Sequence, residues 1–171
     1  MSETEETARK KRAAIISSTY KDLIPYREAV IEACRRMKFG DESMEWSTAG
    51  PNSTVENSMG LVENSGIYIG IFAFRYGTIP DDADISITEM ELKRAQELGH
   101  HMRIFFADEE KAPIPPKFVE TGDGAEKLAA LKTRLRKNYV CAPFTTPDNL
   151  QSLVTQALSE YRDELYRETG G

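Results

Sequence analysis

The feature that most constrains the fold is an uninterrupted apolar run, Ile67–Phe72, which follows Gly66. A strand with one exposed face alternates apolar and polar residues, whereas a strand buried on both faces is apolar throughout. Such strands are typical of the centre of a parallel sheet that is covered by helices on both sides. The run therefore predicts an α/β domain.

The rest of the chain alternates between short apolar runs and segments of helical periodicity. Strands are expected at 13–17, 43–46, 67–72, 102–107 and 139–144. Helices are expected at about 22–40, 54–64, 88–98, 125–137 and 147–168, each with apolar residues at spacings of three and four. Strict alternation with short links predicts a three-layer, flavodoxin-like, five-stranded parallel sheet with helices on both faces.

Composition narrows the class of partner and the compartment. The net charge is -6 and the pI is about 5.1, which makes nucleic acid and anionic membranes unlikely partners. Residues 1–12 are polar and predict a flexible, frayed leader rather than a secretory signal, before a single domain at 13–168 and a tail at 169–171. Cys34 and Cys141 lack metal-ligand spacing, so a reduced cytoplasmic protein is expected.

Several common site motifs are absent from the sequence. There is no P-loop, no dinucleotide-binding fingerprint and no H-E-x-x-H motif. His100 and His101 fall between a predicted helix and strand, where turn residues are a simpler interpretation than a metal site. We therefore expect no metal and no cofactor.

Ligands in doubly wound sheets bind beyond the carboxyl ends of the strands, and the first such end carries Ser17, Ser18, Thr19 and Tyr20. Three hydroxyls and several backbone N–H groups near a helix start can hold a phosphate or a ribose. The alternative is that one hydroxyl only caps the helix.

A second candidate motif directly follows the apolar run. Arg75 supplies a planar cation suited to phosphate or carboxylate, and Tyr76 supplies a ring for stacking. The alternative is a surface loop in which Arg75 pairs with Asp81, Asp82 or Asp84.

A third motif, SITEME at residues 86–91, opens the next predicted helix. Ser86 to Glu89 and Thr88 to Glu91 both have the spacing of a capping box, which explains one glutamate but not both. A carboxylate at this position could also act as nucleophile toward a sugar, or stabilise a cation at its C1 atom.

Taken together, these motifs resemble the uncharacterised domain found at the N-terminus of many STAND/NACHT-type NTPases and repeat proteins. The resemblance runs from about residue 13 to 106, with a weaker echo at 142–144. It is carried by IISSTYKDL (15–23), REAV (27–30), ME (44–45), YIGI (68–71), RYG (75–77) and SITEME (86–91). That domain is usually grouped with TIR-like and nucleoside deoxyribosyltransferase-like domains of flavodoxin-like fold, several of which cleave N-glycosidic bonds in nucleosides or NAD.

The resemblance implies a catalytic glutamate within a T-x-x-E-x-x-x-A pattern, which Thr88, Glu91 and Ala95 match. Glu91 is therefore the catalytic candidate. The sequence departs from the pattern at Gly66, where most members have an aspartate. The substrate-binding candidates lie at the strand ends and the helix start: Ser17, Ser18, Thr19, Tyr20, Glu45, Arg75, Tyr76, Ser86 and Thr88.

These residues predict a TIR-like effector or signalling domain, in a defence setting, that binds and cleaves NAD or a nucleoside. One alternative is a non-catalytic module that self-associates or serves as an adaptor for a STAND-type NTPase domain. The other is a nucleotide sensor without turnover. The expected partners are accordingly an NAD-like small molecule, a second copy of the chain or an NTPase domain.

Overall fold

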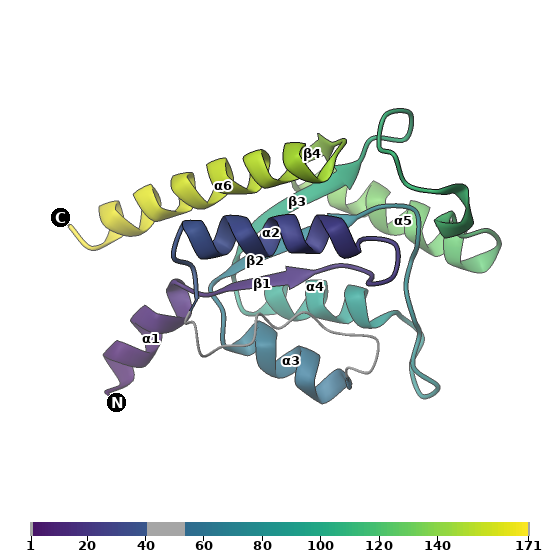
Figure 1. The fold of residues 1–171 in the computed structure, drawn as a ribbon. Coiled ribbons are helices and arrows are strands. Elements are labelled where there is room, and N and C mark those ends of the chain that lie inside the picture. Colours follow the sequence, from purple (N-terminus) through teal and green to yellow (C-terminus); the bar gives the residue numbers. More distant parts are fainter. Residues whose placement is uncertain (1, 41–53, 171) are drawn as a thin grey trace.

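A computed structural model describes residues 2–40 and 54–170, and its sheet has four parallel strands (Figure 1). These are β1 (Ala14–Ser17), β2 (Ile67–Phe72), β3 (His101–Ala107) and β4 (Cys141–Phe144), in the order β1-β2-β3-β4. The described sheet thus has four strands and not the five predicted, because the strand expected at 43–46 lies outside the described residues. The observed order is compatible with a flavodoxin-like sheet, in which the first strand of the chain lies beside the third. Strands β1 and β2, which are neighbours here, correspond to the first and third of the five predicted strands.

Helices cover both faces of the sheet, as predicted. One face packs against α2 (Ile24–Arg36) and α6 (Pro147–Glu168), which lie side by side in Figure 1. The other face packs against α3 (Val55–Glu63), α4 (Ile87–Glu97) and α5 (Asp123–Asn138). A short 3-10 helix, η1 (Pro116–Phe118), lies in the connection from β3 to α5.

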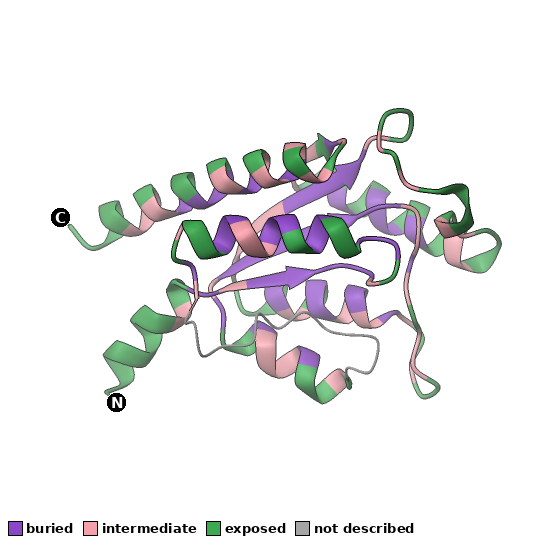
Figure 2. Cartoon of the chain, viewed as in Figure 1, coloured by how far each residue is buried: buried purple, intermediate pink, exposed green. Residues whose placement is uncertain are grey.

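Strand β2 is buried on both faces, as its sequence predicts (Figure 2). Ile67, Ile69 and Ile71 point into the core beneath α2 and α6, while Tyr68 and Phe72 point into the core beneath α3, α4 and α5. The period of two therefore divides one apolar strand between two cores.

Residues expected to form a frayed leader are instead helical, as α1 (Glu3–Lys11). A capping box opens this helix: Ser2 Oγ accepts from the Glu5 N–H, and the Glu5 carboxylate accepts from the Ser2 N–H. None of the residues of α1 is buried, but the end of the helix is attached to the domain, because Tyr161 donates to the Lys11 carbonyl at 2.7 Å.

Most other predicted bounds agree with the observed ones or differ by one or two residues, but α2 ends at Arg36, four residues before the predicted end at 40, and Lys38 beyond it has φ +59°. Helix α2 begins at Ile24, after the predicted start near 22, with Pro25 in its first turn where proline fits best. Strand β3 begins at His101, so this histidine is a strand residue and not a turn residue. Strand β4 begins at Cys141, because the preceding Val140 is 95% exposed and makes no ladder contact.

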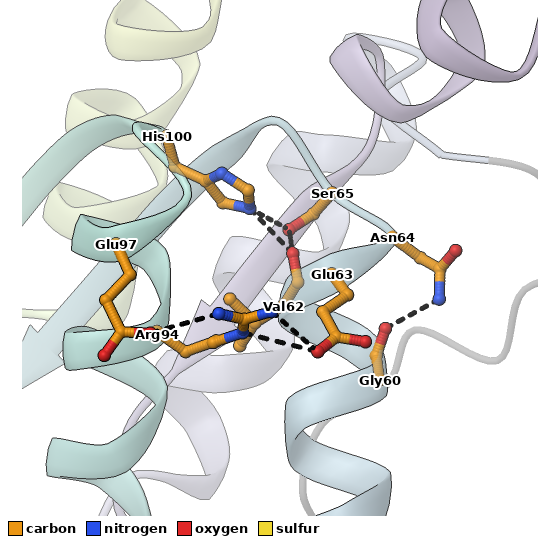
Figure 3. A network of polar contacts seen from close by, with 8 residues as sticks. All are labelled: Gly60, Val62, Glu63, Asn64, Ser65, Arg94, Glu97 and His100. Atoms are coloured by element: carbon orange, nitrogen blue, oxygen red, sulfur yellow. Dashed lines mark hydrogen bonds and ion pairs between the residues drawn. The ribbon is translucent and has the colours of Figure 1, made fainter.

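His100 lies in the turn before β3, as predicted, and joins the ends of α3 and α4 (Figure 3). Its Nε2 lies 2.7 Å from the Val62 carbonyl and 3.2 Å from Ser65 Oγ. Beside it, Arg94 of α4 pairs with Glu63 of α3 at 3.1 Å. Among residues 2–40 and 54–170, no group of three or more His, Cys, Asp or Glu side chains could hold a metal ion. Over the same residues, no helix combines the length and apolarity needed to cross a membrane.

Candidate functional site

The candidate site lies at the carboxyl end of β1, where a buried serine meets a buried glutamate. Ser17 shares the sheet face of Ile15, which packs toward α4, and Ser17 Oγ donates to Glu91 Oε1 at 2.8 Å. Gly70 of β2 lies beside Ser17 in the ladder. A Cβ at Gly70 would be 2.6 Å from the Tyr68 ring, so the absent side chain leaves room for Tyr68 to extend toward Ser17.

Helix α4 turns Glu91 inward because Thr88, Glu91 and Ala95 lie on its buried face. The N-cap of the helix is Ser86, whose Oγ accepts from the Glu89 N–H at 3.1 Å. Neither of the two possible capping boxes is complete, because the Ser86 N–H donates to Tyr76 and not to the Glu89 carboxylate. Ser86 is a simple N-cap, and capping does not account for the Glu91 carboxylate.

Tyr76 completes this cap. Its hydroxyl accepts from the Ser86 N–H at 3.2 Å and donates to Glu89 Oε1 at 2.8 Å. The Glu89 carboxylate also pairs with Lys93 and Arg134 at its other oxygen. Tyr76 is buried, so its ring offers no free face for stacking in this structure.

The pKa of Glu91 is raised from 4.5 to about 7. Burial is the largest cause, because the side chain is 1% exposed and a buried carboxylate loses hydration. The hydrogen bond from Ser17, the charge of Arg27 and the hydroxyl of Ser58 all lower the pKa against this effect. Ser58 Oγ lies close enough to affect the carboxylate but falls short of hydrogen-bond geometry, and Glu91 Oε2 has no partner among the described residues.

Arg27 of α2 is a buried cation whose charge lowers the pKa of Glu91. Its Nη1 donates to Ser18 Oγ, and Ser18 Oγ in turn donates to the Thr19 carbonyl at 2.7 Å. The guanidinium also lies 5.6 Å from the centre of the Tyr20 ring. Burial lowers the pKa of Arg27, whereas the charges of Glu91, Tyr20 and Asp22 raise it.

Buried polar atoms without partners are concentrated around this point. Nine buried side-chain atoms of the described residues have no hydrogen-bond partner, and seven of them belong to this region. These seven are Thr19 Oγ1, Asp22 Oδ2, Arg27 Nε, Arg27 Nη2, Ser58 Oγ, Tyr68 OH and Glu91 Oε2. Since most buried polar atoms in proteins are bonded, such a concentration is typical of a site for a polar ligand.

The loop after β2 approaches the same point. Gly77 has φ +101°, and a Cβ there would be 3.2 Å from Thr19 and 3.4 Å from Thr88 Oγ1. Arg75 Nη1 lies 3.4 Å from Asp22 Oδ1. The alternative pairing with the aspartates of the following loop (Asp81, Asp82 or Asp84) is thus wrong for this structure.

The structure therefore gathers most of the predicted residues at one edge of the sheet: Ser17, Ser18, Thr19, Tyr20, Arg75, Ser86, Thr88 and Glu91. Their roles in binding or catalysis remain predictions. Tyr76 lies among them but supports the cap, and Glu45 lies outside the described residues.

Gly66, the position at which the family pattern has an aspartate, lies at the opposite edge. It precedes β2, where its carbonyl accepts from the His101 N–H. A Cβ at Gly66 would be 2.7 Å from Lys11 Cα and 2.9 Å from the Lys10 carbonyl, so the close approach of α1 excludes a side chain. The missing aspartate therefore removes nothing from the surroundings of Glu91.

Four buried members of the cluster were missed as site residues: Asp22, Arg27, Ser58 and Tyr68. Arg27 follows Leu23 by four residues and precedes Val30 by three, which places a cation on the apolar stripe of its helix. That spacing was the available signal. For Tyr68 the sequence held no signal, because a tyrosine in a buried strand normally belongs to the core.

Fold and site together define a three-layer α/β domain with a buried carboxylate at the carboxyl edge of its parallel sheet. Residues 14–159 match the family described as Domain of unknown function (DUF4062). The chain belongs to this family, which confirms that it is an uncharacterised domain, whereas the link to TIR-like domains and STAND-type NTPases stays a prediction. No curated protein and no solved structure matches the chain.

Proposed function

We propose that this domain is a TIR-like effector that binds NAD or a nucleoside at the carboxyl edge of the sheet and cleaves its N-glycosidic bond with Glu91. One observation carries the proposal. Glu91 is a buried carboxylate with one oxygen held by Ser17, the other oxygen unpartnered among the described residues, and a pKa of about 7. Near neutral pH such a group is present in both protonation states.

The chemistry requires a carboxylate beside the sugar C1 atom. In NAD, the bond between C1 and the nicotinamide nitrogen breaks, and its electron pair leaves with the ring, which becomes neutral. The ionised Glu91 stabilises the positive charge that develops at C1. Water then adds to C1 and releases one proton. Ser17 orients the carboxylate through Oε1, which leaves Oε2 for the sugar.

The test is incubation of the purified chain with NAD and a panel of nucleosides, with products identified by mass. We expect turnover in the wild-type chain, loss of at least about 100-fold in Glu91→Gln, and no loss in Glu97→Gln, which alters an exposed residue of the same helix. Because only the ionised form stabilises the cation, turnover should rise as the pH increases through about 7. Turnover that is unchanged in Glu91→Gln would exclude this role.

A second candidate, a sensor that binds a nucleotide without turnover, is favoured by the burial of Glu91, which is 1% exposed. An enclosed carboxylate can accept a hydrogen bond from a sugar hydroxyl, and recognition, unlike cleavage, needs no room for an attacking water. Calorimetry separates the two functions: a sensor binds the nucleotide, and the mixture contains no cleaved product after prolonged incubation.

A further inference from the structure

We infer that Arg27 binds a phosphate group of the ligand, so that the ligand is a nucleotide rather than a free nucleoside. The inference deepens the proposed function and relies on it for the place of the ligand, beside Glu91. It does not depend on whether Glu91 catalyses cleavage, because recognition of phosphate and bond cleavage are separate properties.

The inference rests on one edge of the Arg27 guanidinium that has no hydrogen-bond partner among the described residues. Arg27 is 2% exposed, and its Nη1 is held by Ser18 Oγ. The two nitrogens that remain, Nε and Nη2, have no partner among the described residues. Their N–H groups point the same way along one edge of the guanidinium plane, which is the edge that grips two oxygens of one phosphate or carboxylate.

The protein groups around Arg27 do not fill this edge. Within the described residues, no carboxylate lies within ion-pair distance of the guanidinium. Glu91 acts on Arg27 only through its charge, and one oxygen of Asp22 is engaged by Arg75. A buried guanidinium keeps its proton, so the cation needs an anion beside it.

A phosphate at this edge would be opposed by two carboxylates, Glu91 and Asp22, and favoured by the cations Arg27 and Arg75. Arg75 partly offsets Asp22, and Glu91 is largely neutral below its pKa of about 7. Phosphate is preferred over a carboxylate ligand because it offers more acceptor oxygens and, as the monoester of AMP, also carries more negative charge. Tyr20, which is partly exposed, lies over the guanidinium, with 5.6 Å between Arg27 Cζ and the centre of the ring.

The experiment compares phosphate-bearing and phosphate-free probes on the Glu91→Gln chain, where turnover cannot consume them. Calorimetry is run with ADP-ribose, AMP and adenosine. We expect the two phosphate-bearing probes to bind at least about tenfold more tightly than adenosine, the range of hydrogen bonds to a charged group. Arg27→Gln, added to Glu91→Gln, should abolish that preference, and Arg27→Lys should restore only part of it because lysine lacks the two-pronged edge. Arg36→Gln, an exposed change on the same helix, is the matched control and should keep the full preference.

If Arg27→Gln does not fold, the preference for AMP over adenosine in the Glu91→Gln chain, and its reduction in Arg27→Lys, still decide the matter. Equal affinity for the two probes, no binding of any phosphate-bearing probe, or a preference that survives Arg27→Gln would each overturn the inference. An Arg27-dependent preference without cleavage supports it while overturning the proposed catalysis. Cleavage of nucleosides without any preference for phosphate does the reverse.

Discussion

Replacing Glu91 with glutamine should change how the stability of the domain depends on pH. Glutamine has nearly the same shape as glutamate and can still accept from Ser17, but it cannot ionise. The ionised form of Glu91 is disfavoured in the folded chain because burial removes its hydration. The substitution therefore removes a charge that destabilises the native state at high pH.

The magnitude follows from the difference between the raised pKa of about 7 and the ordinary value of 4.5. Each pKa unit corresponds to about 1.4 kcal/mol, so the full effect is about 3 kcal/mol. Below pH 4.5 both the folded and the unfolded chain carry the proton, and there is no effect. Between 4.5 and about 7 the unfolded chain has released the proton and the folded chain has not, so the free energy of unfolding falls as the pH rises. Above pH 7 the free energy of unfolding has lost the full contribution of about 3 kcal/mol.

The assay is urea unfolding followed by circular dichroism at pH values from 4.5 to 8, on the wild-type and Glu91→Gln chains. Their stabilities should be similar at the acid end and diverge by about 3 kcal/mol toward pH 8, with the variant the more stable. Glu97→Gln controls for the loss of one glutamate from an exposed position on α4. A constant difference between wild type and Glu91→Gln across the pH range would refute the reasoning, because Glu91 would then titrate alike in both states.

Three further predictions concern the backbone and the cap, each measured by thermal or urea unfolding. Gly66→Asp should lose about 1–3 kcal/mol, since its Cβ would be 2.7 Å from Lys11 Cα; unchanged stability would show that α1 can move away at no cost. Ser86→Ala should lose about 1 kcal/mol, because Ser86 caps α4; a loss near zero would contradict this assignment. Gly77→Ala should lose about 1–3 kcal/mol, because alanine is strained at φ +101°; a neutral result would mean that the loop can adopt another conformation.

The sequence predicts the layers of the fold well because apolar periodicity reports burial directly. The bounds predicted for β2 and for α6 are those of the structure. Helix α1 was missed because it has no apolar stripe, and a method based on periodicity finds only helices that bury a face. A signal was present in the spacing from Ser2 to Glu5, which is that of a capping box.

The site is only partly predictable, because its contacts join distant parts of the chain. Parallel topology is enough to expect Ser17 and Glu91 near one edge, but the bond between them depends on which face each side chain takes. The partner of Arg75 is Asp22, on a different strand end, and three nearer aspartates in the sequence are not used. Local spacing carries no information about such a choice.

The arrangement of Glu91 and Arg27 is better explained by function than by stability. A structural ion pair holds its charges in contact, which pulls the pKa of the acid below its ordinary value. Here the carboxylate and the guanidinium are buried together without a direct ion pair, each keeps unpartnered atoms among the described residues, and the pKa of Glu91 is about 7. Apolar side chains of similar volume would stabilise a core at least as well as such charges do. The two residues lie at the carboxyl edge, where ligands bind in doubly wound sheets. Burying their charges without a direct ion pair costs stability, and we expect that cost at a site where a charged ligand supplies the missing partner.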